Sequence, residues 1–240
     1  MPLPRLKPEA AFLVNQIDTK GKIPEWATEK IIQKTKKESY KILDKYLAQR
    51  SFDLYLATSL RELDDFTKAE KFASHIEQNL NISVVYTGGL GVTKETPEYD
   101  AAEAKGDMER LFLERSQSLL MIAADKFTVG KYFEAATMAL SGKPVVLLFD
   151  DENQANIIKV RHPLKTLGAV EESYGFHALV NNQDDPLQCL KAELGLDEHF
   201  GNDFRLMLNE NHTDRRRNCY CPYCKSLIIR RPFWLKAHND

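Results

Sequence analysis

The sequence predicts an α/β fold with a parallel sheet covered by helices on both faces, and three observations support it. Short apolar and β-branched runs alternate with segments of helical periodicity. The runs are almost continuously apolar, which is typical of strands buried on both faces. The chain has 240 residues, of which 43% are hydrophobic and 28% charged, so it is long enough for one packed domain with extensions.

Five apolar runs are predicted to be the strands of this sheet: Phe52–Ala57, Ile82–Tyr86, Leu119–Ala123, Val145–Phe149 and His177–Val180. Apolar residues at helical spacing predict three helices between them: Leu63–Leu80, Ala104–Phe112 and Tyr132–Leu140. Ligands of parallel sheets bind at the carboxyl ends of the strands. Functional residues are therefore expected just after the ends of the first four strands.

Three regions are expected along the chain: a helical extension over 1–50, the α/β domain over 51–195 and a basic, cysteine-rich tail over 196–240. The extension has a proline-containing leader and then a charged helix, Glu25–Gln49. The apolar stripe of that helix (Ile32, Tyr40, Leu43, Tyr46 and Leu47) is expected to pack on the main domain or on a sister subunit.

Charge and cysteine content limit the classes of partner and the compartment. The 33 Lys and Arg against 35 Asp and Glu give a net charge of −2, which gives the whole molecule no general attraction to nucleic acid or membranes. No apolar run has the ~18 residues of a membrane span, and the N-terminus lacks the apolar core of a secretory signal. Four cysteines, without the spacing of a disulfide framework, favour a reducing compartment. We expect a cytoplasmic protein with no membrane contact.

The most informative stretch is 125–149, in which a loop after the third strand leads into a helix that carries Glu134. Gly142 and Pro144 end this helix and begin the next strand. A carboxylate in the first turns would face the ligand crevice and would suit nucleophilic attack on a sugar's anomeric carbon. The alternative is an acidic residue that only complements the helix dipole.

Several motifs around this glutamate occur in a recognisable order. The first strand ends in YLATS (residues 55–59), Gly130 precedes Glu134 by four residues, and GKPV begins at Gly142, eight residues after Glu134. In this order and spacing, from Phe52 to Phe149, the chain resembles the nucleoside 2-deoxyribosyltransferase-like superfamily. The resemblance implies a flavodoxin/Rossmann-like sheet and makes Glu134 the catalytic nucleophile. Asp125 is the candidate for the family's accompanying acidic residue, because Thr128 stands at the usual position six before the glutamate.

The first strand, FDLYLATSLR, also resembles the opening of TIR domains, which cleave the nicotinamide–ribose bond of NAD with a glutamate after the fourth strand. The Ser-x-Trp-Cys element of TIR domains is absent around Glu134. Both resemblances imply glutamate-assisted cleavage of an N-glycosidic bond in a nucleoside, nucleotide or NAD-like substrate. They also imply that the chain acts as an oligomer or with a partner in a prokaryotic defence complex.

The predicted substrate-binding residues follow the strands. Thr58, Ser59 and Arg61 come after the first strand and suit sugar hydroxyls or a phosphate. Gly88 and Gly89 come after the second and would let the backbone approach a phosphate, although a plain flexible loop explains them as well. Three candidates remain. Asp107 would contact the base, and Gly130 belongs to the family motif. Tyr132 would either stack on the base or pack in the core.

The tail predicts a structural zinc site at Cys219, Cys221 and Cys224, while catalysis needs no cofactor. A closed zinc site has four ligands, and the fourth would be His238, His212, Cys189 or a residue of a neighbouring chain. Reduced thiols without metal are the alternative. The arginines around the cysteines make the tail a candidate contact for nucleic acid, or else a solvated or subunit-binding segment.

Two functions remain open from the sequence. The first is an N-glycosidase-type enzyme that cleaves or transfers a base–sugar bond through Glu134. The second is a non-catalytic nucleotide sensor or scaffold whose tail binds a partner or nucleic acid, which the absence of an acid at Thr128 favours.

Overall fold

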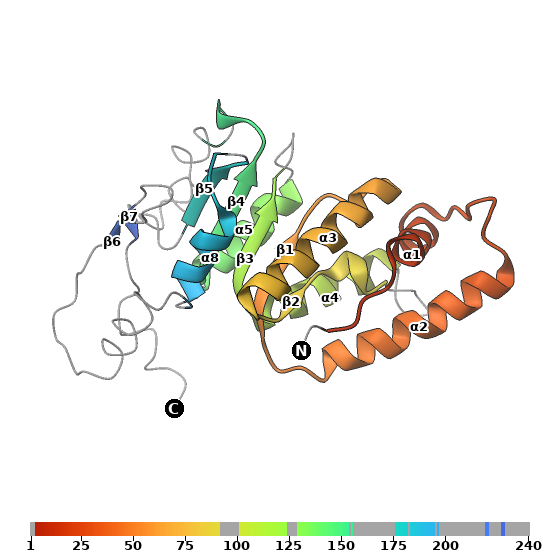
Figure 1. Cartoon of the computed structure of the whole chain (residues 1–240). Coiled ribbons are helices and arrows are strands. Elements are labelled where there is room, and N and C mark those ends of the chain that lie inside the picture. Colours follow the sequence, from red (N-terminus) through yellow and green to blue (C-terminus); the bar gives the residue numbers. More distant parts are fainter. Residues whose placement is uncertain are drawn as a thin grey trace. The chain divides into compact units, whose positions relative to one another are not determined.

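The computed structural model of the chain describes residues 3–91, 101–123, 129–153, 155, 176–181, 183–194 and 196, together with 219–220 and 227–228. The chain divides into two compact units, Met1–Gln117 and Ser118–Asp240 (Figure 1). Its main sheet is parallel, has the strand order β2-β1-β3-β4-β5 and is flanked by helices, which confirms the predicted α/β class. The strands are β1 (Phe52–Ala57), β2 (Val84–Val85), β3 (Ser116–Ile122), β4 (Val145–Phe149) and β5 (Phe176–Val180).

The predicted strands agree with the observed ones at all five places, with differences at the ends. β1 and β4 have the predicted bounds, and β5 begins one residue early. β2 is shorter than the predicted Ile82–Tyr86, because only Val84 and Val85 pair with β1. β3 begins three residues before Leu119, and in this added part the buried hydroxyl of Ser116 donates to the carbonyl of Phe112.

The first unit begins with two helices, α1 (Pro8–Lys20) and α2 (Glu29–Leu47). The prediction of a leader followed by a single helix, Glu25–Gln49, was wrong, because α1 occupies the predicted leader. Pro8 stands at the first helical position of α1 and Gly21 ends it with φ +60°, both common at those positions. Thr28 caps α2, which begins four residues later than expected. Helix α1 contacts both α2 and α3 (Leu63–Leu80), and Figure 1 shows it next to both.

An aromatic cluster joins α2 to the sheet and to α4 (Ala101–Arg115). The ring of Tyr46 stacks on Phe52 of β1 with centroids 5.7 Å apart, and both rings meet Phe112 of α4 edge-on. All three side chains are buried. Of the predicted apolar stripe of α2, Ile32 and Tyr46 are thus buried within the chain itself, as is Ile42, whereas Tyr40 and Leu43 are half-buried and Leu47 is exposed.

The second unit contains α5 (Val129–Leu140) and α8 (Pro186–Leu194), both in contact with β4. All five residues of β4 are buried, as expected for a strand between two parallel neighbours. His177 of β5 is 1% exposed and its Nε2 lies 2.6 Å from a carboxylate oxygen of Glu193, which links β5 to α8. Two short antiparallel strands, β6 (Cys219–Tyr220) and β7 (Leu227–Ile228), belong to the predicted tail. None of the described helices is both long and apolar enough to cross a bilayer.

Candidate functional site

The helix that carries Glu134 ends in a well-defined C-terminal motif. Beyond its last residue, Gly142 has φ +64° and donates its N–H to the carbonyl of Ala139, and Lys143 donates to Met138. These two bonds form a Schellman motif, in which glycine supplies the left-handed conformation. The predicted stop at Gly142 is therefore confirmed, and α5 begins three residues before the predicted Tyr132.

The buried face of α5 contains a lysine. Lys131 is 6% exposed and shares this face with Ala135, Met138 and Ala139. Its Nζ donates a 2.7 Å hydrogen bond to the carbonyl of Ala123, directly after β3. Because a buried ammonium is costly without hydrogen-bond acceptors, this contact fixes the first turn of α5 at the carboxyl end of β3.

Glu134 lies three residues after Lys131 and is half-buried at the edge of the same helix face. Glu134 has a polar or electrostatic interaction within the chain. A half-buried carboxylate held on a packed helix retains a fixed direction while one side stays accessible, which a nucleophile requires. Glu134 was selected from the sequence, whereas Lys131 was assigned no role. Its position one turn before Glu134, on the apolar stripe, was the available signal.

The predicted residues after β1 lie in a short loop that leads into α3. Thr58 and Ser59 are half-buried, and Arg61 is exposed. The backbone N–H groups of Arg61 and Glu62 both donate to the carboxylate of Asp65, which caps the beginning of α3. The Arg61 backbone thus has a structural role, and its exposed guanidinium extends from an anchored turn.

The two glycines after β2 form part of a 3₁₀ turn, η1 (Thr87–Gly89). A Cβ atom added at Gly88 would lie 2.1 Å from a methyl group of Leu60 and 2.8 Å from the Tyr86 ring. The N–H of Gly89 donates to Tyr86, and its carbonyl accepts from Leu6 at 2.8 Å. The glycines therefore allow a close approach of the chain's own side chains, and the loops after β1 and β2 touch at Leu60 and Gly88.

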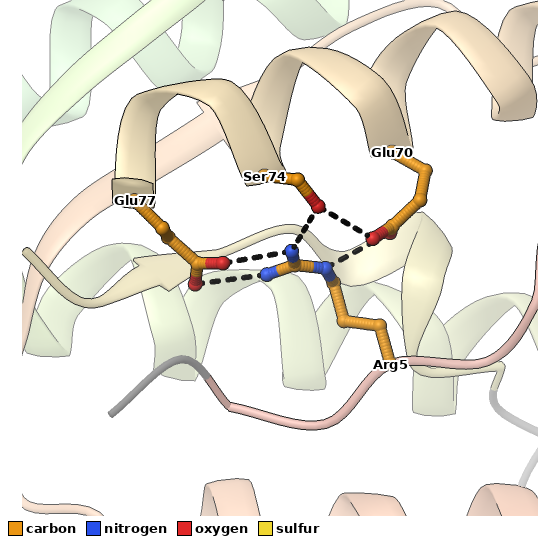
Figure 2. A network of polar contacts seen from close by, with 4 residues as sticks. All are labelled: Arg5, Glu70, Ser74 and Glu77. Atoms are coloured by element: carbon orange, nitrogen blue, oxygen red, sulfur yellow. Dashed lines mark hydrogen bonds and ion pairs between the residues drawn. The ribbon is translucent and has the colours of Figure 1, made fainter. Parts of the chain in front are cut away.

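The N-terminal segment that covers this turn is anchored by Arg5 (Figure 2). Its guanidinium donates to both carboxylate oxygens of Glu77, to Glu70 and to the hydroxyl of Ser74, all on α3. Arg5 is 5% and Glu77 3% exposed, so the pair is buried. Burial lowers the pKa of Arg5, but the hydrogen bonds to Glu77 and Glu70 outweigh burial and raise the pKa above its ordinary value. This network was not predicted from the sequence, in which Arg5 stands in a proline-containing segment with no pattern that assigns it a role.

The other predicted site residues are placed as follows. Asp107 lies on α4 and its side chain is largely exposed. Its carboxylate oxygen Oδ1 is 3.9 Å from a guanidinium nitrogen of Arg110. Gly130 is exposed in the first turn of α5, with no atom within 4 Å of an added Cβ. Tyr132 belongs to α5, and Asp125 lies outside the described residues.

The predicted zinc site falls largely outside the described part of the chain. Cys219 is in β6, paired with Ile228, and Cys221, Cys224 and His238 are not among the described residues. Cys189, one alternative for the fourth ligand, is buried in α8. Within the described ranges, no three His, Cys, Asp or Glu residues come together as a metal site. The zinc site stays a prediction, which elemental analysis of the purified protein would test.

Comparison of the chain with models of protein families, with curated proteins and with solved structures found no match.

Proposed function

We propose that the chain is an N-glycosidase-type enzyme that cleaves or transfers the base–sugar bond of a nucleoside, nucleotide or NAD-like substrate, with Glu134 as its catalytic carboxylate. The observation that carries this proposal is the position of Glu134, half-buried one turn after a lysine that binds the carbonyl directly after β3. The strand order β2-β1-β3-β4-β5 is that of flavodoxin-like folds, in which ligands bind outside the carboxyl ends of the strands.

In the proposed reaction, a carboxylate oxygen of Glu134 attacks the anomeric carbon as the C–N bond breaks. A neutral base leaves with the bonding electron pair and takes up a proton, whereas the cationic nicotinamide of an NAD-like substrate leaves as a neutral molecule without one. Water or an acceptor base then attacks the same carbon, loses a proton to the solvent and releases the carboxylate, so atoms and charge balance. Lys131 is a positioning residue in this scheme, because its bond to Ala123 holds the turn that precedes Glu134.

The other predicted residues have assigned roles in this proposal. Thr58, Ser59 and Arg61 would bind sugar hydroxyls or a phosphate, and Asp107 and Tyr132 would contact the base. Asp125 would assist Glu134. The backbone of Gly88 and Gly89 is a weaker candidate for phosphate binding, because the Gly89 N–H already donates to Tyr86. A role in prokaryotic antiviral defence is part of the same proposal and rests on the resemblance alone.

The test is to incubate the purified protein with NAD and a panel of nucleosides and nucleotides, and to separate any released base by chromatography. Glu134→Gln keeps the shape of the side chain and removes its charge, so release should fall by orders of magnitude while the fold persists. Glu25→Gln is the matched control, because Glu25 is exposed in the link between α1 and α2. Equal release by Glu134→Gln and the parent would remove Glu134 from the mechanism.

The second candidate is a non-catalytic nucleotide sensor or scaffold, which the threonine at position 128 favours. It predicts binding of a nucleotide, measured by calorimetry, without release of base from any member of the panel. Release of base by the parent that is lost in Glu134→Gln would rule out this candidate.

A further inference from the structure

One face of α2 carries a straight row of five lysines: Lys30, Lys34, Lys37, Lys41 and Lys45. Their spacings of four, three, four and four residues keep them on one side of an α-helix. All five are exposed. With a rise of 1.5 Å per residue, the row is about 22 Å long. We call it the lysine row.

The lysine row faces away from the rest of its unit because the opposite side of α2 is packed. The buried residues of α2 are Ile32, Thr35, Ser39, Ile42 and Tyr46. The hydroxyl of Ser39 donates to the carbonyls of Leu90 and Gly91, and Arg115 donates to the carbonyls of Leu47 and Gln49 at the C-terminal end of the helix. These contacts prevent α2 from rotating, so the row is a fixed surface (Figure 1, orange helix).

The row has five lysines, and two carboxylates of α2 lie one turn from some of them: Glu38 from Lys34 and Lys41, and Asp44 from Lys41. Within the described part of the chain, no ion pair joins any of the five lysines to a carboxylate, whereas Lys68 on α3 lies 2.6 Å from Asp64. Like charges at these spacings repel each other, and a lysine in the first turn opposes the helix dipole, whereas Lys45 in the last turn and the one-turn pair of Lys34 with Glu38 favour the helix. Five lysines against two nearby carboxylates leave this side of α2 with a net positive charge.

We propose that the lysine row binds the phosphate backbone of a nucleic acid. A narrow, straight row of cations matches a linear polyanion, and duplex DNA carries about one negative charge per 1.7 Å of its axis. Lysines contact phosphates as flexible point charges, and such contacts carry no sequence information, so binding to the backbone is independent of sequence. A membrane fits less well, because an interfacial helix buries its apolar face in lipid, and the apolar face of α2 is packed inside the protein.

The test is the salt dependence of binding to a fluorescent duplex of arbitrary sequence, measured by anisotropy on the full chain. Five phosphate contacts contribute about −4.5 to the slope of the logarithm of the association constant against the logarithm of the salt concentration. This slope corresponds to about a 500-fold loss of the association constant between about 50 and 200 mM KCl. Replacing Lys37 and Lys41 by Gln should make the slope shallower by about 1.8. The three remaining lysines of the row should then account for only about a 40-fold loss of the association constant over the same range of salt. A single strand should show a shallower slope per contact.

The matched control is Lys68→Gln with Lys71→Gln, which removes the same charge from exposed positions on α3. This control should keep the parent's slope, and circular dichroism should show unchanged helix content in both double variants. An equal slope for the parent and the Lys37→Gln, Lys41→Gln variant would overturn the proposal, because any binding would then come from elsewhere, such as the basic tail. So would absence of duplex and single-strand binding by the parent, or row-dependent binding to phosphatidylserine vesicles alone.

Discussion

The guanidinium of Arg5 donates to both carboxylate oxygens of Glu77, at 2.9 and 2.8 Å, although 72 residues separate them in the sequence. This buried pair fastens the N-terminal segment to α3. The backbone bond from Leu6 to Gly89 then brings the same segment over the turn after β2. The segment that contains Arg5 and Leu6 is thus part of the packed first unit.

Replacing Arg5 by Ala should destabilise the protein by about 3–5 kcal/mol, because it leaves the buried carboxylate of Glu77 without its partner. The measurement is the midpoint of urea unfolding, followed by circular dichroism. A double replacement of Arg5 and Glu77 by Met should recover most of the loss, since no buried charge then remains unpaired. Lys68→Ala, in an exposed pair with Asp64, should leave the midpoint unchanged. An Arg5→Ala midpoint equal to that of the parent would contradict the structural role of this pair.

Alkaline pH should destabilise the protein through two buried tyrosines. Burial raises the pKa of Tyr46 and of Tyr86 well above the ordinary value of 10.0. Above about pH 10 the unfolded chain releases these protons and the folded chain keeps them. The stability contributed by the raised pKa values is therefore complete below pH 10 and is lost as the pH rises, by about 1.4 kcal/mol per pH unit for each tyrosine.

The measurement for these tyrosines is urea unfolding at several pH values from neutral to 11. Tyr86→Phe should reduce the slope above pH 10 by about 1.4 kcal/mol per pH unit, and adding Tyr46→Phe should double the reduction. At neutral pH, Tyr86→Phe should raise stability by about 1 kcal/mol, because the Tyr86 hydroxyl is buried without a hydrogen-bond partner among the described residues. An unchanged alkaline slope in the double variant would show that the folded state ionises these tyrosines as readily as the unfolded state.

Two glycines should respond oppositely to alanine. Gly91 has φ +61°, and an added Cβ would lie 2.7 Å from a methyl group of Leu6, so Gly91→Ala should cost at least about 1–2 kcal/mol. Gly106 lies within α4 with nothing within 4 Å of an added Cβ, so Gly106→Ala should stabilise by about 1 kcal/mol. Thermal unfolding of the two variants tests both signs at once. A stabilising Gly91→Ala would show that the N-terminal segment does not pack against this turn.

Association into oligomers stays a prediction, and the structure changes which residues would mediate it. The apolar stripe of α2 is mostly used within the chain, whereas Ile23 and Trp26, between α1 and α2, are 60% and 50% exposed. If the N-terminal helices mediate association, Ile23→Asp with Trp26→Ala should dissociate the oligomer in light scattering without lowering the unfolding midpoint. A parent protein that is monomeric throughout would contradict the prediction.

The sequence determined the fold class and most elements, because the spacing of apolar residues reflects which side chains are buried in each helix or strand. β1 and β4 could be delimited to the residue, since all five residues of β4 are buried and turn residues bound both strands. α1 was missed although Pro8 and Gly21 mark its ends, because the prolines around its start were interpreted as a leader. The end of α5 just before Gly142 was predictable, because glycine is the residue most often found in the left-handed conformation that follows a helix.

Only the tertiary structure decided how polar residues are used. Nothing local indicates that Arg5 binds Glu77, that Lys131 binds the carbonyl of Ala123, or that Gly88 makes room for Leu60. These contacts depend on how separate elements pack against each other, and the partner of a single polar residue cannot be predicted from apolar periodicity. The lysine row was equally present in the sequence. It became a surface only when packing on the opposite side of α2 fixed the direction in which its lysines point.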